Sequence, residues 1–248
     1  MKEQTRAKDL PTAADAGAMR ANIDSARQGV GVAAARAAAS GAKGAASRKS
    51  LFSVKELTTI ALLGVLSYLL MLIRFPLPFM PPFMDFDFAA VPELIGVFLL
   101  GPVPGVFIVL IKLLIKMATV GTGSAFTGEI INFMLSCCLI LVAWIIYNTK
   151  RTKRTALIGM ISATAITAVV ACFANIYLIF PLYANLYGLD VDKIIGMVAA
   201  VNPYVKSKMS LVMLGILPFN IIKNGVAAFL VFVVYNRLVK MLKHLGWR

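Results

Sequence analysis

The stretch TGEIINFMLSCCLILVAWIIY, residues 127–147, is long and apolar enough to cross a lipid bilayer as a helix. A membrane-spanning helix needs about 20 mostly apolar residues, and the one charged residue of this stretch, Glu129, lies near its start. Comparable apolar blocks follow one another after Leu57, and 60% of the whole chain is hydrophobic. The sequence therefore predicts an all-α integral membrane protein.

Five further apolar blocks are separated by polar or proline-containing segments. They cover residues 57–73, 89–100, 105–119, 156–179 and 210–238. We therefore expect six transmembrane helices within residues 51–248. Because of its glycine and prolines, the segment Gly101-Pro102-Val103-Pro104 is expected to form a tight turn. Residues 180–208 are expected to form a long loop.

The positions of the basic residues predict the orientation in the membrane. The net charge is +14, and most of the 25 Lys and Arg residues precede Leu57, fall within 150–154 or follow Asn236. Basic residues are enriched on the cytoplasmic flanks of membrane helices, so both termini are expected to be cytoplasmic. These residues flank apolar blocks and form no stripe interleaved with exposed aromatics. Membrane lipids, and not nucleic acid, are the expected surroundings.

The first 50 residues differ in composition from the rest of the chain. They are rich in Ala, Gly, Ser and charged residues, which predicts a disordered or transiently helical, basic cytoplasmic extension over residues 1–50. A cleaved signal peptide is not expected, because the segment has no apolar core of about 7–15 residues.

The last apolar block carries a polar group of residues beside a proline. Asn220, Lys223 and Asn224 have the i, i+3, i+4 spacing that places side chains on one helix face. Pro218 removes a helical hydrogen bond and is expected to loosen the turn containing the Leu214 carbonyl. Polar groups in a membrane need partners, so this face is either a ligand site or an interhelical hydrogen-bond cluster.

Other polar residues could extend such a site. Asn175 can add an amide, and amides that both donate and accept suit a flat heteroaromatic ligand with imide-like edges. Glu93 follows Pro92 at a helix start, where the helix dipole favours a carboxylate, so a structural role and a site role are equally expected. Glu129 and Asn132 share a face that either lines a site or, for Glu129, caps a helix.

Two lysines of the 105–119 block, Lys112 and Lys116, lie one turn apart. Long basic side chains can run along apolar surface and keep the charge in water, so we expect these two to snorkel or to contact a partner.

Cysteine and histidine content argues against enzyme and metal chemistry. The three cysteines, Cys137, Cys138 and Cys172, lie in apolar blocks, and the one histidine, His244, is in the C-terminal tail. Neither a metal-ligand set nor a nucleophile–base pair is visible. No Gly-x-x-x-x-Gly-Lys-[Ser/Thr] phosphate loop occurs either. We expect no enzyme activity, no metal site and no cofactor, and any ATP hydrolysis would need another protein.

Four motifs resemble a known family over about residues 55–240. They are FPLPF at Phe75–Phe79, DFAAVPELIG at Asp87–Gly96, GPVPG at Gly101–Gly105 and PFNIIKN at Pro218–Asn224. In this order and spacing they resemble the riboflavin-specific substrate-binding (S) components of energy-coupling factor (ECF) transporters. The resemblance implies a six-helix protein of a bacterial plasma membrane that captures riboflavin, its transported substrate, at the outer face. It also implies a transmembrane coupling protein and two ATPase subunits as partners.

The resemblance also implies roles for individual residues. Asn220, Lys223 and Asn175 would bind the flavin ring, the first outer loop would act as a gate, and Asp85 or Asp87 would meet the ribityl hydroxyls.

The family often carries Ala-x-x-x-Ala on its first helix, a face of small residues that meets the coupling protein. Here Val65 stands at the second alanine position, so a face formed by Ala61, Gly64 and Ser67 is expected to dock instead.

Three alternatives stay open. The first is an S component for another vitamin or heterocycle. The second is a stand-alone, ion-coupled secondary transporter, a class that usually shows inverted repeats and membrane acids; only Glu93 and Glu129 are candidate acids, and no convincing repeat is present. The third, a lipid-modifying membrane enzyme, lacks a visible catalytic set.

Overall fold

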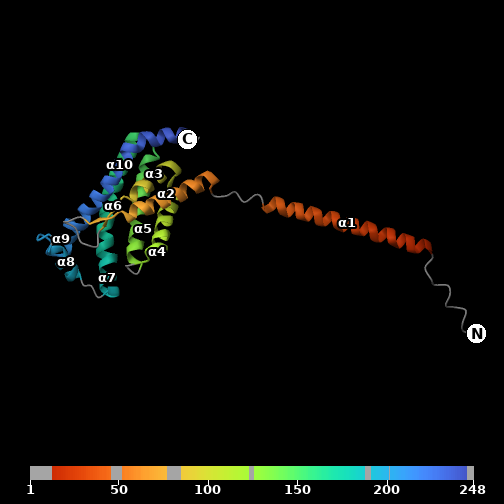
Figure 1. The fold of residues 1–248 in the computed structure, drawn as a ribbon, viewed down its shortest axis with the longest axis horizontal. Coiled ribbons are helices and arrows are strands. Elements are labelled where there is room, and N and C mark those ends of the chain that lie inside the picture. The colour runs from red at the N-terminus through yellow and green to blue at the C-terminus, as the bar shows by residue number, and fades with distance from the viewer. Residues whose placement is uncertain are drawn as a thin grey trace, which may run out of the picture. The chain divides into compact units, whose positions relative to one another are not determined.

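The computed structural model describes residues 13–45, 52–76, 85–122, 126–187, 191–200 and 202–244. The chain forms two compact units, Met1–Leu51 and Phe52–Arg248. In the first unit the described part is helix α1 (Ala13–Ala45), on which Met19, Ile23 and Val30 are exposed (Figure 1). The disordered or transiently helical extension over residues 1–50 stays a prediction.

The second unit is helical. In chain order its helices are α2 (Val54–Leu72), α3 (Ala90–Leu100), α4 (Pro102–Thr119), α5 (Thr127–Tyr147), α6 (Lys153–Ala174), α7 (Phe180–Tyr187), α8 (Val191–Ala199), α9 (Lys208–Leu211) and α10 (Leu217–His244) (Figure 1). Two π-helical turns, η1 (Asn175–Ile179) and η2 (Val212–Ile216), join α6 to α7 and α9 to α10. Strands β1 (Phe75–Pro76) and β2 (Asp85–Phe86) form a short antiparallel pair. The all-α prediction is therefore confirmed for the described residues, apart from this pair.

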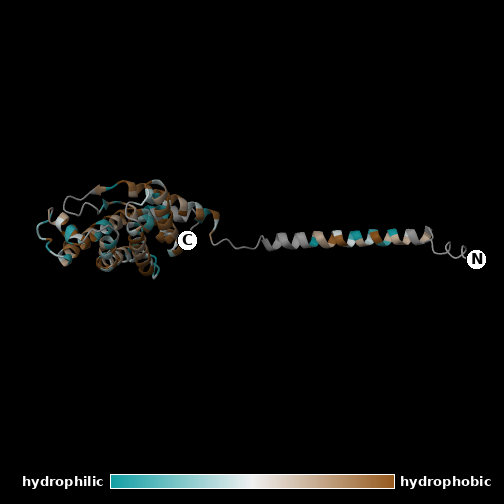
Figure 2. Ribbon diagram, turned by 90° about the horizontal axis from the view of Figure 1, so that it is seen from below, coloured by the Kyte–Doolittle hydropathy of each residue, from teal (hydrophilic) through white to brown (hydrophobic). Residues whose placement is uncertain are grey.

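Five helical segments of the described chain are long and apolar enough to cross a membrane, and a shorter apolar helix, Ala90–Leu100, accompanies them. The five are Val54–Leu72, Pro102–Thr119, Thr127–Tyr147, Lys153–Asn185 and Lys208–Arg237. Large apolar side chains such as Leu62, Ile145, Ile161 and Phe229 are exposed, and lipid would cover them. Figure 2 shows how hydrophobic residues are distributed along these helices. Six crossings and cytoplasmic termini stay predictions.

Two expected connections are largely helical. The tight turn predicted at residues 101–104 is present but shorter, because Gly101, whose φ is 100°, makes the corner and α4 begins directly after it at Pro102. Proline suits the first position of a helix, where its missing N–H costs no hydrogen bond. The predicted loop at 180–208 is wrong, because it contains α7 and α8. Ile194 and Val198 of α8 are buried in an apolar cluster with Leu211 and Ile216, which stabilises the helix.

The main apolar core lies between α3, α4, α5, α6 and α10, and small residues set the distance between α5 and α6. Ala143, Ala156 and Ala163 are fully buried in it. Between them lies Gly159, where an added Cβ would stand 2.8 Å from the carbonyl oxygen of Ala143. Because that neighbour is backbone, a side chain at residue 159 would push the two helices apart.

We therefore predict that Gly159→Ala lowers the stability of the fold by about 1–3 kcal/mol through overpacking. The measurement is the apparent melting temperature of the detergent-purified protein. Gly225→Ala is the matched control, because no atom lies within 4 Å of a Cβ built on Gly225 of α10. Equal melting temperatures for the two variants would contradict the close α5–α6 contact.

Candidate functional site

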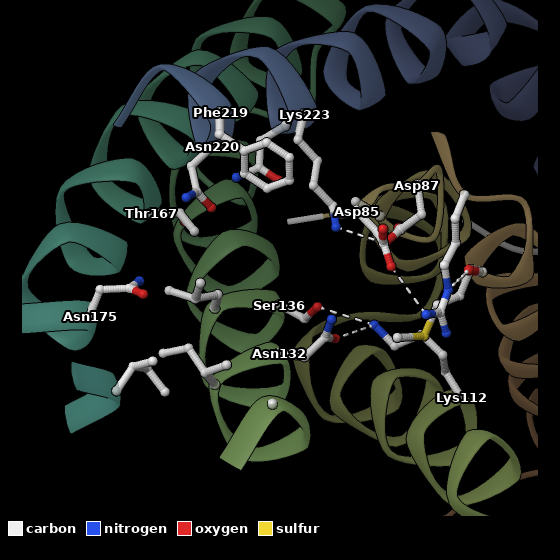
Figure 3. A pocket seen from close by; sticks show the side chains of 18 of the residues that line it. Asp85, Asp87, Lys112, Asn132, Ser136, Thr167, Asn175, Phe219, Asn220 and Lys223 are labelled. Carbon is white, nitrogen blue, oxygen red and sulfur yellow. Dashed lines mark hydrogen bonds and ion pairs between the residues drawn. The ribbon is translucent and has the colours of Figure 1, made fainter. Parts of the chain in front are cut away.

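A cavity of about 260 Å³ lies between β2, α4, α5, the α6–α7 segment and α10 (Figure 3). Its apolar lining includes Met71, Ile131, Leu135, Ile179 and Phe219. Its polar lining consists of Arg74, Asp85, Asp87, Lys112, Lys116, Asn132, Ser136, Thr167, Asn175, Asn220, Lys223 and Asn224. A concave space in which polar groups converge among apolar side chains is the general form of a small-molecule site.

Both π-helical turns lie next to this cavity and have the same cause. η1 ends two residues before Pro181, and η2 ends two residues before Pro218. Proline has no N–H and collides with the carbonyl one turn earlier, and a widened turn relieves that collision. The predicted loosening around Leu214 is thus confirmed by η2. Asn175 opens η1 and Asn220 follows η2, so the two irregular turns carry the two asparagines to the cavity.

The amides of Asn175 and Asn220 are each oriented by their own helix. Asn175 Nδ2 donates to the Ala171 carbonyl at 2.8 Å, and Asn220 Nδ2 donates to the Ile216 carbonyl at 2.9 Å. An amide group has two N–H donors and an oxygen that accepts. Each side chain therefore keeps its oxygen and one N–H for a further partner in the cavity.

An ion pair joins α10 to the chain segment that enters α3. Lys223 Nζ lies 2.7 Å from Asp87 Oδ2, although 136 residues separate them. The other carboxylate oxygen of Asp87 accepts the backbone N–H of Ala89 at 3.0 Å. Asp87 is thereby held in a single orientation at the cavity edge. At a more exposed position, Arg74 and Asp85 form a second pair at 3.2 Å across the strands.

A third ion pair is fully buried. Lys112 Nζ of α4 lies 2.5 Å from Glu93 Oε1 of α3, and the two side chains are 1% and 0% exposed. The Ser67 hydroxyl of α2 shares its one proton between this carboxylate, at 3.2 Å, and the Ala89 carbonyl, at 2.8 Å. A fourth pair joins Lys116 to Glu129. Of the two alternatives given for these lysines, snorkelling and contact with a partner, the structure shows contact: each has a carboxylate partner inside the bundle, and Lys112 also contacts Asn132 and Ser136.

The structure brings together most of the residues expected from the sequence. Six of them line the one cavity: Asn220, Lys223, Asn224, Asn175, Asp87 and Asp85. Glu93 does not line it and lies behind Lys112 instead. Arg74, Lys112, Ser136 and Thr167 line it although the sequence did not mark them as site residues. For Lys112 the sequence did carry a signal, a charged residue inside an apolar block. It did not show that the side chain points into the bundle.

The expected docking face on α2 is not a single exposed surface. Gly64 is buried, and a Cβ there would lie 2.6 Å from Ile111 Cγ2 of α4. Ser67 is buried too, and its hydroxyl donates to the Ala89 carbonyl at 2.8 Å. Of the three small residues, Ala61 is exposed. Gly64 and Ser67 face α4 and α3 because they fall on the inner stripe of the α2 helix, with Ile60 and Met71.

Comparison with known proteins gives a consistent result. A family model described as the substrate-specific component of ECF transporters matches residues 55–235. The chain is 32% identical to the riboflavin transporter RibU of Staphylococcus aureus over 77% of this chain and 94% of that protein. It is 25% identical to the riboflavin transporter FmnP of Bacillus subtilis over 75% and 92% of the respective chains. A solved S component of a bacterial ECF transporter superposes with a TM-score of 0.60 at 32% identity, covering 76% and 98%.

The buried pair makes a stability prediction. Lys112→Met leaves the carboxylate of Glu93 without its cation in a membrane interior, which should destabilise the protein by about 3–5 kcal/mol. Adding Glu93→Gln removes the uncompensated charge and should recover most of that loss. The measurement is again the apparent melting temperature in detergent. A single variant as stable as the double variant would show that the two side chains do not compensate each other.

Proposed function

This chain belongs to the family of ECF transporter substrate-specific components, and we propose that it captures riboflavin in the cavity described above for import by an ECF-type transporter. The family match covers residues 55–235, which is most of the unit Phe52–Arg248, and it leaves residues 1–50 outside. The protein is a multi-pass membrane protein of the bacterial plasma membrane and not an enzyme.

The observation that carries the riboflavin assignment is the convergence of Asn175, Asn220 and Lys223 on one cavity. A flavin ring is flat, and one of its edges places an N–H between two carbonyl groups. An asparagine amide complements such an edge, because it offers an acceptor to the N–H and a donor to a carbonyl. Both asparagines keep these two groups after bonding to their own helices. The apolar side chains Ile179 and Phe219 then provide contact for the ring faces.

Lys223 can bind the ligand while it keeps its ion pair with Asp87. Its bond to Asp87 uses one of the three N–H donors of the ammonium, so another can donate to a ring carbonyl. Asp85 and Asp87 flank the end of the first outer loop and line the cavity, where their oxygens can accept from the ribityl hydroxyls. Ligand contact with Asp87 would thus be felt at the loop that we expect to act as a gate.

The ion pairs Lys112–Glu93 and Lys116–Glu129 argue against transport that is coupled to an ion. The two acids that could carry a coupling proton or cation are Glu93 and Glu129, and each is engaged by a lysine. Energy is instead expected from the family's partners, a transmembrane coupling protein and two ATPase subunits. Ala61 and the exposed apolar side chains around it on α2 are our proposed contact with the coupling protein.

The proposal is tested by titrating the detergent-purified protein with riboflavin and following the quenching of flavin fluorescence. A tight capture subunit should bind with a dissociation constant of about 1–100 nM, corresponding to about −10 to −12 kcal/mol. Absence of quenching at micromolar protein would reject the flavin assignment, and other vitamins would then be titrated against the same preparation.

Lys223→Ala should weaken riboflavin binding by more than about tenfold, because it removes a donor to the ring and leaves Asp87 without its partner. Lys206→Ala is the charge-matched control, since Lys206 is exposed and does not line the cavity. Unchanged affinity in Lys223→Ala, with the protein folded, would remove Lys223 from the site.

A further inference from the structure

All three donors of the Lys112 ammonium are engaged at the edge of the cavity. Lys112 Nζ lies 2.5 Å from Glu93 Oε1, 2.8 Å from Asn132 Oδ1 and 3.3 Å from Ser136 Oγ. An ammonium has three N–H groups and no acceptor. Lys112 is therefore saturated by the protein, although it lines the cavity. Lys112 can therefore affect ligand binding only indirectly, by orienting the side chains that it bonds, Asn132 and Ser136.

The saturated lysine determines which end of Asn132 faces the ligand. The oxygen and nitrogen of an amide are usually hard to tell apart in a structure, but a cation that can only donate requires the oxygen. Figure 3 shows the bonds from Lys112 to Asn132 and Ser136 side by side on the α5 wall. With Asn132 Oδ1 turned to Lys112, the amide nitrogen and its two N–H groups remain for the cavity.

Ser136 is oriented by the same cation. A hydroxyl has one proton to donate and two acceptor positions. Because Lys112 donates to Ser136 Oγ at 3.3 Å, one acceptor position is occupied while the proton stays available. Ser136 lies one turn after Asn132 on α5, and both line the cavity. The α5 wall therefore presents donors in two successive turns.

The opposite wall has a different character. Asn175 and Asn220 each spend one N–H on their own helix and keep an oxygen that accepts. The cavity thus has donors from α5 on one side, whereas the amides of the α6–α7 segment and α10 on the other side can both accept and donate (Figure 3). A ligand that fits has to present acceptors to α5.

We propose that the buried Lys112–Glu93 pair is a positioning device that turns Asn132 Nδ2 and Ser136 Oγ toward the ligand as hydrogen-bond donors. Their acceptors are oxygen or ring-nitrogen atoms of the bound flavin, so the inference rests on the proposed riboflavin function. Burying two charges seldom adds to stability over apolar residues of the same volume. The orientation of Asn132 and Ser136 toward the ligand would explain why the Lys112–Glu93 ion pair lies in the interior of a membrane bundle.

The sharpest variant is Asn132→Asp. Its side chain has the same shape and can still accept from Lys112, but it offers no N–H to the ligand. Riboflavin affinity should fall by about tenfold or more, as it should in Asn132→Ala. Thr164→Val is the control: it removes a buried polar group on α6, the Thr164 hydroxyl, but Thr164 does not line the cavity. Its affinity should equal that of the unaltered protein.

The positioning role of Lys112 needs a double-mutant cycle. Riboflavin dissociation constants are measured for Asn132→Ala, for the charge-free pair Glu93→Gln with Lys112→Met, and for the three changes together. If the pair acts through Asn132, the combined loss is clearly smaller than the product of the two separate losses. Melting temperatures of all variants identify any that fail to fold. If a variant of the cycle does not fold, the riboflavin affinity of Asn132→Asp, compared with that of the unaltered protein, tests the inference instead.

The outcomes separate the two claims. Unaltered protein that does not bind riboflavin overturns the proposed function, and this inference with it. Riboflavin binding that is normal in the unaltered protein and equally tight in Asn132→Asp overturns this inference alone. A combined loss equal to the product of the separate losses contradicts the positioning role and assigns the pair to the stability of the bundle.

Discussion

A bilayer interior offers no water to a polar side chain, so every charged group placed there has to find its partner within the protein. Three ion pairs with largely buried side chains meet this requirement among the described residues, Lys112–Glu93, Lys116–Glu129 and Lys223–Asp87, and a more exposed fourth pair, Arg74–Asp85, accompanies them. All four cations line one cavity. Charge compensation thus does more than make the helices compatible with lipid, because it gathers α3, α4, α5 and α10 around a single polar space.

The irregular backbone serves the same space. Pro181 and Pro218 each follow a π-helical turn, and these turns bring Asn175 and Asn220 to the cavity from helices that otherwise run regularly. Asp87 connects α10, through Lys223, to the segment that enters α3. The remainder of the bundle, with Gly159 and its alanine neighbours, keeps these elements at a fixed spacing.

Much of this arrangement could be predicted from the sequence because it depends on local periodicity. The 127–147 block coincides with α5, and the i, i+3, i+4 spacing correctly placed Asn220, Lys223 and Asn224 on one face that lines the cavity. What failed depends on contacts between distant segments. The direction of Lys112 is decided by Glu93 on another helix, and the inward positions of Gly64 and Ser67 are decided by α4 and α3. Helix α8 has a local signal that the prediction of a loop overlooked, the i, i+3, i+4, i+7 spacing of Val191, Ile194, Ile195 and Val198, and η2 and α9 cover its apolar residues.

The most direct test of the account is an experimental structure of the protein with riboflavin bound. The account predicts the flavin ring in the cavity between α5 and α10, with the Asn175 and Asn220 amides and Lys223 Nζ at hydrogen-bond distance from polar ring atoms. It further predicts Asn132 Nδ2, and not Oδ1, directed at the ligand. Riboflavin bound outside this cavity, or inside it without contact to Asn220 and Lys223, would contradict the central claim.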